Sequence, residues 1–89
     1  MKLETTEQFE ALMEGDSGKW QGDNALQGLL IMKDFLPEDA TLIQGAGHDV
    51  IWGPNIEELI DGGITEEAVR KLRQLNWMIE DSTYLACFV

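Results

Sequence analysis

Residues 41–67, TLIQGAGHDVIWGPNIEELIDGGITEE, decide the fold, because strand and helix signals follow one another closely in this stretch. β-rich segments flank Gly45-Ala46-Gly47, which predicts a hairpin that turns at these three residues. His48 then serves as a turn residue, and Asp49 beside it bonds a local backbone N–H. Gly53-Pro54 breaks the second strand, since proline has no N–H to donate to a ladder.

The second half of the stretch contains two helix starts. Asn55 caps a short helix, NIEELID, and Gly62-Gly63 ends it. Thr65 caps the helix that follows. That helix carries Glu66–Arg70 and Glu67–Lys71, two pairs of opposite charge at a spacing that stabilises helices. A strand pair followed by a helix pair is therefore expected.

A first helix is predicted near the N-terminus, where Thr5 and Gln8 have capping-box spacing and Gly15 follows as the terminating residue. Its outer face carries a row of three acidic residues. At 100° per residue these fall within about 60° of one another, and they recur ~4.5 and ~6 Å apart along the axis. Phosphates on one strand of a duplex recur on a comparable spacing. The acidic residues of the row are Glu7, Glu10 and Glu14.

A second helix begins at Asp23 or Asn24 and continues to about Leu36, where Pro37 stops it. Apolar residues cover most of its circumference, which predicts that it is the central, buried helix. These residues are Ala25, Leu26, Leu29, Leu30, Met32 and Phe35.

Residues 77–89, WMIEDSTYLACFV, predict a second hairpin that turns near Asp81-Ser82. The element order is then ααββααββ. This order is typical of an α+β fold in which one domain, 1–89, packs its helices on one face of a small antiparallel sheet made of two hairpins. The strand from Tyr84 to Val89 could lie at the sheet edge and pair with a copy of itself, so a monomer and a homodimer both stay open.

The three tryptophans receive different interpretations. Trp52 and Trp77 lie in predicted strands and are expected in the core. Trp20 lies in a Gly-rich loop, where it is either a lid over the core or an exposed anchor for a partner.

Charge is the feature that most restricts function. Seventeen Asp and Glu stand against six Lys and Arg, for a net charge of −11. Such a surface repels phosphate backbones and anionic membranes, so neither nucleic acid nor a membrane is an expected partner. It attracts basic protein surfaces instead. Nothing approaches the ~20 apolar residues of a membrane span, and the N-terminus lacks an apolar signal region. The single cysteine, Cys87, fits a reducing cytoplasm.

The chemistry for catalysis is not evident. His48 is the only histidine, and no spacing joins it to Cys87 and carboxylates as an acid–base or zinc site. Cys87 lies in an apolar strand, which favours a packed small hydrophobe over a nucleophile. We therefore expect no enzyme, no metal and no cofactor.

Several acidic residues oppose local helix electrostatics. Glu14, Asp34 and Asp61 fall near helix C-termini, where a negative charge costs about 0.3–1 kcal/mol. Residues that break a local rule without visible gain are candidates for function. A solvated face of modest stability cost is the alternative. The predicted partner-binding residues are Glu7, Glu10, Glu14, Asp34, Glu38, Asp39 and Asp61.

Five short motifs resemble small accessory proteins of bacteriophages and prophages. They are Ala25–Gly28–Leu29, His48-Asp49-Val50-Ile51-Trp52, Gly63-Ile64-Thr65-Glu66-Glu67, Trp77-x-Ile79 and Cys87-Phe88-Val89. The resemblance covers residues 24–89 and leaves the first helix outside. Accessory proteins of this size and charge include anti-CRISPR proteins, several of which resemble nucleic acid to their targets. The resemblance implies that function as one expectation and carries over no binding residue.

The expected function is therefore a phage-encoded inhibitor of the anti-CRISPR type, which binds a basic nucleic-acid-binding surface of a bacterial defence effector and blocks DNA or RNA access. An acidic immunity or antitoxin-like protein that neutralises a basic toxin or nuclease would use the same physics. A phage accessory domain whose charge confers only solubility is the third alternative.

Overall fold

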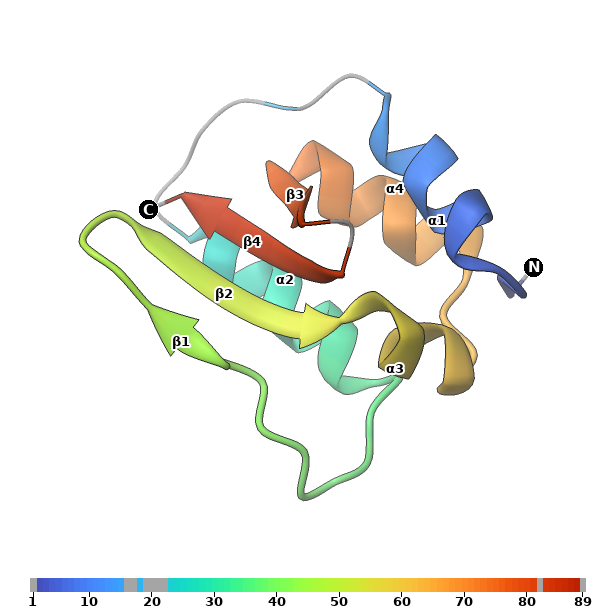
Figure 1. Cartoon of the computed structure of the whole chain (residues 1–89), viewed down its shortest axis with the longest axis horizontal. Coiled ribbons are helices and arrows are strands. Elements are labelled where there is room, and N and C mark those ends of the chain that lie inside the picture. The colour runs from blue at the N-terminus through green and yellow to red at the C-terminus, as the bar shows by residue number, and fades with distance from the viewer. Residues whose placement is uncertain (1, 16–17, 19–22, 82, 89) are drawn as a thin grey trace.

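The computed structural model describes residues 2–15, 18, 23–81 and 83–88. Within these residues the helices and strands follow the order α1, α2, β1, β2, α3, α4, β3, β4. The predicted α+β class and the ααββααββ order are thereby confirmed (Figure 1). The elements are α1 Thr6–Met13, α2 Asn24–Lys33, β1 Gly45–Ala46, β2 Val50–Asn55, α3 Ile56–Asp61, α4 Glu66–Gln74, β3 Trp77–Glu80 and β4 Tyr84–Phe88.

The sheet joins two hairpins through their second strands. Its order is β1-β2-β4-β3, and every neighbouring pair is antiparallel. β4 therefore pairs with a strand on each side, so the prediction that the last strand lies at the sheet edge is wrong. The edge strands are β1 and β3, so β4 has no free edge along which a second copy of the chain could pair.

The hairpin of β1 and β2 turns later than predicted. Gly45 and Ala46 form β1 itself, the turn lies at 47–49, and residues 41–44 are not a strand. The reason is the indole of Trp52, which lies opposite Gly45: a Cβ at Gly45 would lie 3.3 Å from Trp52 Cε3. A residue without a side chain fits there, so glycine is used within the strand. His48 is exposed in the turn, as predicted.

A β-bulge interrupts the pairing of β2 with β4. Trp52 pairs with Ala86 and Asn55 with Tyr84, so three steps on β2 oppose two on β4. Pro54, which has no N–H to donate, lies within the bulge. Gly53-Pro54 thus bends the strand without ending it, contrary to the prediction. Because directly paired residues share a face, the bulge places Trp52 and Asn55 on the same side of the sheet.

Local capping signals define α1, α3 and α4 as the sequence predicts, whereas Asp23, the N-cap of α2, makes no side-chain capping hydrogen bond. Thr5 Oγ1 accepts from the Gln8 N–H at 3.2 Å, and Gln8 Oε1 accepts from the Thr5 N–H at 3.1 Å. Gly63, at φ 85°, follows α3 in a Schellman motif: its N–H and that of Ile64 bond the last turn of α3.

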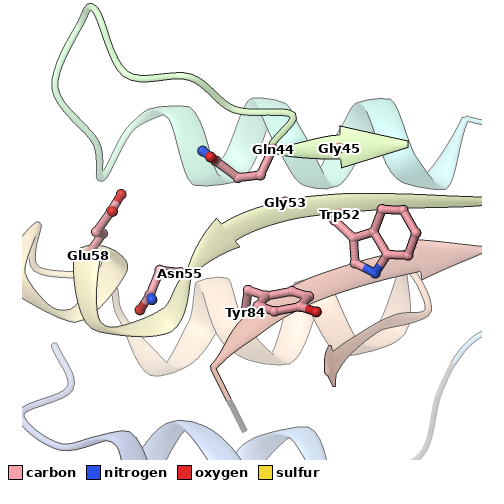
Figure 2. Close-up of a pocket in the computed structure, with 7 residues that line it drawn as sticks. All are labelled: Gln44, Gly45, Trp52, Gly53, Asn55, Glu58 and Tyr84. Carbon is pink, nitrogen blue, oxygen red and sulfur yellow. The ribbon is translucent and has the colours of Figure 1, made fainter. Parts of the chain in front are cut away.

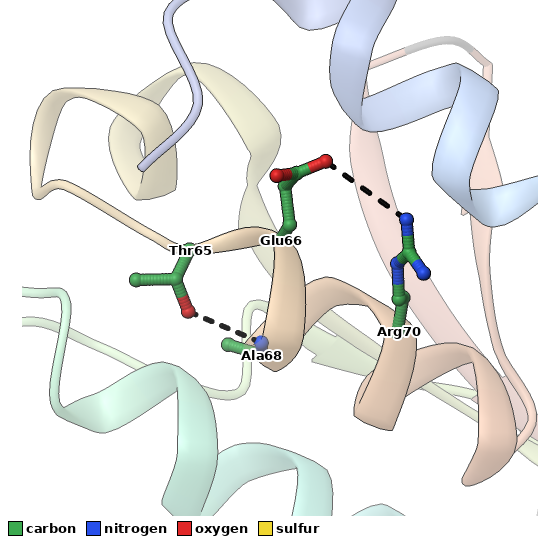
Figure 3. Close-up of polar contacts among 4 residues, drawn as sticks. All are labelled: Thr65, Glu66, Ala68 and Arg70. Atoms are coloured by element: carbon green, nitrogen blue, oxygen red, sulfur yellow. Dashed lines mark hydrogen bonds and ion pairs between the residues drawn. The ribbon is translucent and has the colours of Figure 1, made fainter. Parts of the chain in front are cut away.

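The start of α4 is fixed by two side-chain contacts (Figure 3). Thr65 Oγ1 accepts from the Ala68 N–H at 3.2 Å, as its predicted capping role requires. Arg70 and Glu66 form an ion pair at 3.9 Å. Both side chains of the pair are solvent-exposed, so its contribution to stability is small, ~0.3–0.5 kcal/mol.

α2 is not the central, buried helix that its apolar circumference predicts. Leu26 is 56% and Leu30 55% exposed, because α2 lies behind the sheet with only one side packed against it (Figure 1). The α-helix ends at Lys33, and tighter i→i−3 hydrogen bonds continue the turn as far as Leu36 before Pro37.

The core lies between the sheet and the helices, and Trp77 is its largest side chain. Trp77 is fully buried, and its indole N–H donates to the Asn24 carbonyl at 3.1 Å. A Cβ on Gly28 of α2 would overlap this ring, so glycine is what lets the helix approach the sheet. Cys87 is also fully buried, as predicted. Trp20 lies outside the described residues.

Candidate functional site

The acidic row on α1 has the predicted geometry. Glu14 is the C-cap and keeps helical dihedrals, φ −79° and ψ −7°, so the periodicity of the row extends through it. Glu7 and Glu14 are exposed, and Glu10 is half-buried. Phe9 and Met13 of α1 are buried in the core, which fixes the direction in which the row points.

Two members of the row line a hollow between α1 and β3. Glu10 and Glu14 share this hollow, of about 580 Å³, with the carboxylate of Asp81 from the β3–β4 turn. The hollow, called here the α1–β3 hollow, is completed by Met13, Arg73, Met78 and Ile79. The fold thus adds a third carboxylate that the sequence reasoning missed, because the predicted turn near Asp81 carried no indication of the helix beside it.

Arg73 is the basic side chain that lines the α1–β3 hollow. Its Nε–H donates to the Gly15 carbonyl at 2.8 Å, and its Nη1 donates to the Trp77 carbonyl at 3.4 Å. Among the described residues, no ion pair joins it to Glu10, Glu14 or Asp81. The guanidinium therefore holds the end of α1 to the start of β3, while the three carboxylates have no directly paired counter-ion in the described part of the chain.

The other predicted residues lie elsewhere. Asp34 is the C-cap of α2, and Glu38 and Asp39 are exposed in the turn in which the Ala40 N–H bonds the Pro37 carbonyl. Asp61, the last residue of α3, lines a different hollow with Phe35, Pro37, Glu58 and Gly62. The Asp61 hollow contains no residue of the α1 row, and the seven predicted residues are spread over three helices and a turn, so they do not form one site.

Acidic residues also surround α3. Asp61 lines a second hollow, with Glu57 and with Glu4 of the N-terminal segment. Glu58, on the same helix, lines both the Asp61 hollow and a further hollow beside β2, described below. The acids of α3 therefore form a band that leads from the N-terminal segment to the sheet. Glu57 and Glu58 also lie in the first turn of α3, where negative charges are favourable to the helix dipole.

The front face of the sheet is mainly apolar, and no helix of the described residues covers it. In Figure 1 none of the four described helices crosses in front of β2 and β4. According to the strand register, the side chains on this face point away from the core. Phe88 is 47% exposed, whereas Ala86 is covered by its neighbours. The apolar and aromatic residues of this open face are Val50, Trp52, Met78, Tyr84, Ala86 and Phe88, and the same register places Asn55 and Glu80 on it.

Trp52 belongs to this open face and not to the core. It is half-buried, in contrast to Trp77, so its predicted core position is wrong. The cause is the register: Trp52 pairs with Ala86, which shares its face with Tyr84, whereas the core side of β4 carries Leu85 and Cys87. The sequence of β4 does not indicate which of its faces meets the core, since the residues on both faces are apolar.

A hollow of about 400 Å³ lies where the open face meets α3 (Figure 2). We call it the β2–α3 hollow. The rings of Trp52 and Tyr84 lie at one end of it, and the Glu58 carboxylate lies at the other, toward the Gln44 amide. Its lining residues are Gln44, Gly45, Trp52, Gly53, Asn55, Glu58 and Tyr84.

The Tyr84 hydroxyl links this hollow to the acids of the β3–β4 turn. It donates to Asp81 Oδ2 at 3.2 Å. Partial desolvation raises the pKa of Tyr84, and the bond to Asp81 and the charges of Asp81 and Glu80 raise it further. These contacts favour the neutral, hydrogen-bond-donating phenol over the phenolate.

Other chemistry is limited in the described residues. No three His, Cys, Asp or Glu side chains among them are grouped so as to hold a metal ion. Burial raises the pKa of the Cys87 thiol. None of the described helices has the length and hydropathy to cross a bilayer. What the described surface offers is carboxylates, aromatic rings and apolar area.

Comparisons with known proteins give no match, so the functional proposal depends on the surfaces described above. No protein-family model, no curated protein and no solved structure matches this chain.

Proposed function

We propose that this protein acts by binding a basic protein surface in competition with nucleic acid, and that the α1 row and the α1–β3 hollow form a principal contact. One observation carries the proposal. Glu10, Glu14 and Asp81 line a single hollow whose arginine is engaged with backbone carbonyls. Carboxylates gathered in this way favour Arg and Lys from outside the chain.

The physics of such a contact has a long-range and a short-range part. The net charge of −11 steers the chain toward positive surfaces, with a range near 8 Å at physiological salt. At contact, carboxylates form charge-assisted hydrogen bonds with guanidinium and ammonium groups. A target that normally holds a phosphate backbone already presents its cations in a row, and the spacing of the α1 row suits them.

The biological setting that we propose is inhibition of a bacterial defence effector by a phage-encoded protein of the anti-CRISPR type. This part rests on the resemblance of residues 24–89 to phage accessory proteins. An immunity or antitoxin-like protein directed against a basic nuclease would use the same carboxylates, and the identity of the captured partner separates the two.

The test compares two triple charge reversals. Glu7, Glu10 and Glu14→Lys reverse the α1 row. Asp23, Asp49 and Glu67→Lys change the net charge by the same amount at exposed positions that do not line the α1–β3 hollow. Tagged forms are incubated with lysates of CRISPR-bearing bacteria, and each captured protein is purified and assayed for binding its own DNA or RNA with and without this chain.

We expect the unaltered chain to displace nucleic acid from the captured protein, the α1 variant to lose most of this competition, and the control variant to retain it. Circular dichroism confirms that both variants fold. Equal losses in the two variants would show that only total charge matters. Undiminished competition by the α1 variant would refute a role for the row.

A further inference from the structure

The β2–α3 hollow has a composition that the acidic row does not share: two aromatic rings and one carboxylate. The bulge at Gly53-Pro54 creates it, because the bulge turns Asn55 to the side of the sheet on which Trp52 lies. Tyr84 pairs with Asn55 and so presents its ring on that side as well. The hollow is thus built by a specific irregularity of β2.

Glu58 faces this hollow instead of capping its own helix. It stands three residues after the N-cap Asn55, where a glutamate commonly reaches back to the N-cap N–H. α1 shows that arrangement, with Gln8 bonding the Thr5 N–H. In the described part of α3 the cap consists of the Asn55 side chain accepting from the Glu57 N–H at 2.8 Å, and no bond from Glu58 to Asn55 accompanies it. The Glu58 carboxylate lines the hollow.

Gln44 adds a second acceptor near Glu58. Its Nε2 donates to the Thr41 carbonyl, which leaves the amide oxygen as the end available to a ligand. No Lys or Arg lines the hollow within the described residues. The polar groups at this end therefore favour a donor that carries positive charge.

We propose that the β2–α3 hollow binds an arginine side chain of the basic protein partner. The stem lies along the faces of Trp52 and Tyr84, and the guanidinium binds the Glu58 carboxylate. Arginine fits better than lysine because its planar, weakly hydrated guanidinium matches a carboxylate with two N–H donors in a fixed geometry. This inference rests on the proposed function in requiring a basic protein partner.

Two other occupants are disfavoured by charge. A nucleic acid base could stack on the rings, but its phosphates would meet Glu58 and the band of acids on α3. A second copy of this chain would bring a further net charge of −11 to the same place. A basic protein segment is the occupant whose charge is complementary to the whole surface.

The experiment titrates the full chain with three capped tripeptides, Gly-Arg-Gly, Gly-Lys-Gly and Gly-citrulline-Gly, at low salt. Citrulline keeps the shape of arginine and lacks its charge. The readout is the indole N–H resonance of Trp52, assigned by its loss in Trp52→Phe. The buried indole of Trp77 is the internal reference, since it already donates to the Asn24 carbonyl. We expect a saturable shift of the Trp52 signal with the arginine peptide, a weaker one with lysine and none with citrulline.

Matched variants locate the charge that matters. Glu58→Gln removes the carboxylate from the hollow and should weaken arginine binding roughly tenfold. Glu57→Gln makes the same change one residue earlier, in a different hollow, and should leave the affinity unchanged. Tyr84→Phe keeps the ring and loses only the hydroxyl, so it should bind nearly as well as the unaltered chain.

The proposal would be overturned by a Trp52 resonance that does not move, by equal shifts with arginine and citrulline, or by equal losses in Glu58→Gln and Glu57→Gln. Its failure is distinguishable from failure of the proposed function, because the peptide titration needs no target and the competition test alters only α1. Loss of competition in the α1 variant, with no arginine binding, would refute the hollow alone.

Discussion

Each face of the sheet carries a tryptophan, and the two tryptophans lie in different environments. Trp77 points to the helices, is fully buried and has its indole N–H bonded to a carbonyl. Trp52 points to the open side, is half-buried and lines the β2–α3 hollow. Both lie in strands, and both have apolar neighbours. Register and helix coverage, more than residue type or local sequence, decide which tryptophan stabilises the fold and which is available to a partner.

The largest expected effect is on the covered face. Trp77→Ala should lower the free energy of unfolding by about 3–5 kcal/mol, since it leaves a cavity and removes the indole hydrogen bond. For a small domain this is a large share of total stability. Urea unfolding followed by far-UV circular dichroism measures it. A loss of unfolding free energy no larger than that caused by Trp52→Ala would contradict the proposed difference between the covered and the open face.

Gly28→Ala tests the covered face from the helix side. Within a helix this change usually stabilises by about 1 kcal/mol. Here the added methyl would overlap the Trp77 ring, so we expect a destabilisation of about 1–3 kcal/mol. Gln27→Ala, at an exposed neighbouring position, is the control and should be nearly neutral. In a Trp77→Phe background the destabilisation by Gly28→Ala should be smaller. An equal destabilisation there would show that overlap with the Trp77 indole is not its cause.

Trp52→Ala is the matching change on the open face. We expect it to lower the free energy of unfolding by about 1 kcal/mol, because the ring is only half-buried. The same variant should lose most of its affinity for the arginine peptide, since the aromatic face is gone. Urea unfolding and the peptide titration, the latter read from backbone resonances, measure the two effects. A severe loss of stability would place Trp52 in the core after all.

The smallest expected effect concerns the Tyr84 hydroxyl. Tyr84 is the only tyrosine, so phenolate absorbance reports its pKa directly. The midpoint should lie above that of free tyrosine, because partial desolvation and Asp81 disfavour the phenolate. Its contribution to stability is complete below the ordinary tyrosine pKa and is lost as pH rises through the raised one. Asp81→Asn should lower the midpoint more than Glu80→Gln does, and an unchanged midpoint in Asp81→Asn would contradict the hydrogen bond.

Local signals account for the parts of the fold that could be predicted. Thr5, Asn55 and Thr65 were identified as caps because their hydrogen bonds close within three residues. The Gly62-Gly63 termination is equally local. The α1 row could be predicted for the same reason, since its geometry depends only on helical periodicity.

The parts that could not be predicted depend on contacts between distant segments. The position of β1 depends on the ring of Trp52 across the ladder, and the exposure of Leu26 depends on which side of α2 meets the sheet. Asp81 joins Glu10 and Glu14 only through packing of the last hairpin against the first helix. Neither the separation of the seven predicted acids nor the β2–α3 hollow has a signal in the local sequence.

The burial of Cys87 has a practical consequence for identifying the target. The chain contains one thiol, and that thiol lies fully inside the core with its pKa raised by desolvation. Since thiolates, not thiols, react with maleimides, the native cysteine should be chemically silent while the chain is folded. An engineered cysteine at the exposed position Ile43, which neighbours the β2–α3 hollow in sequence and does not line it, would then be the single reactive site. A photo-crosslinker could be attached there without removing Cys87, so a captured partner would be joined covalently beside the hollow that it occupies.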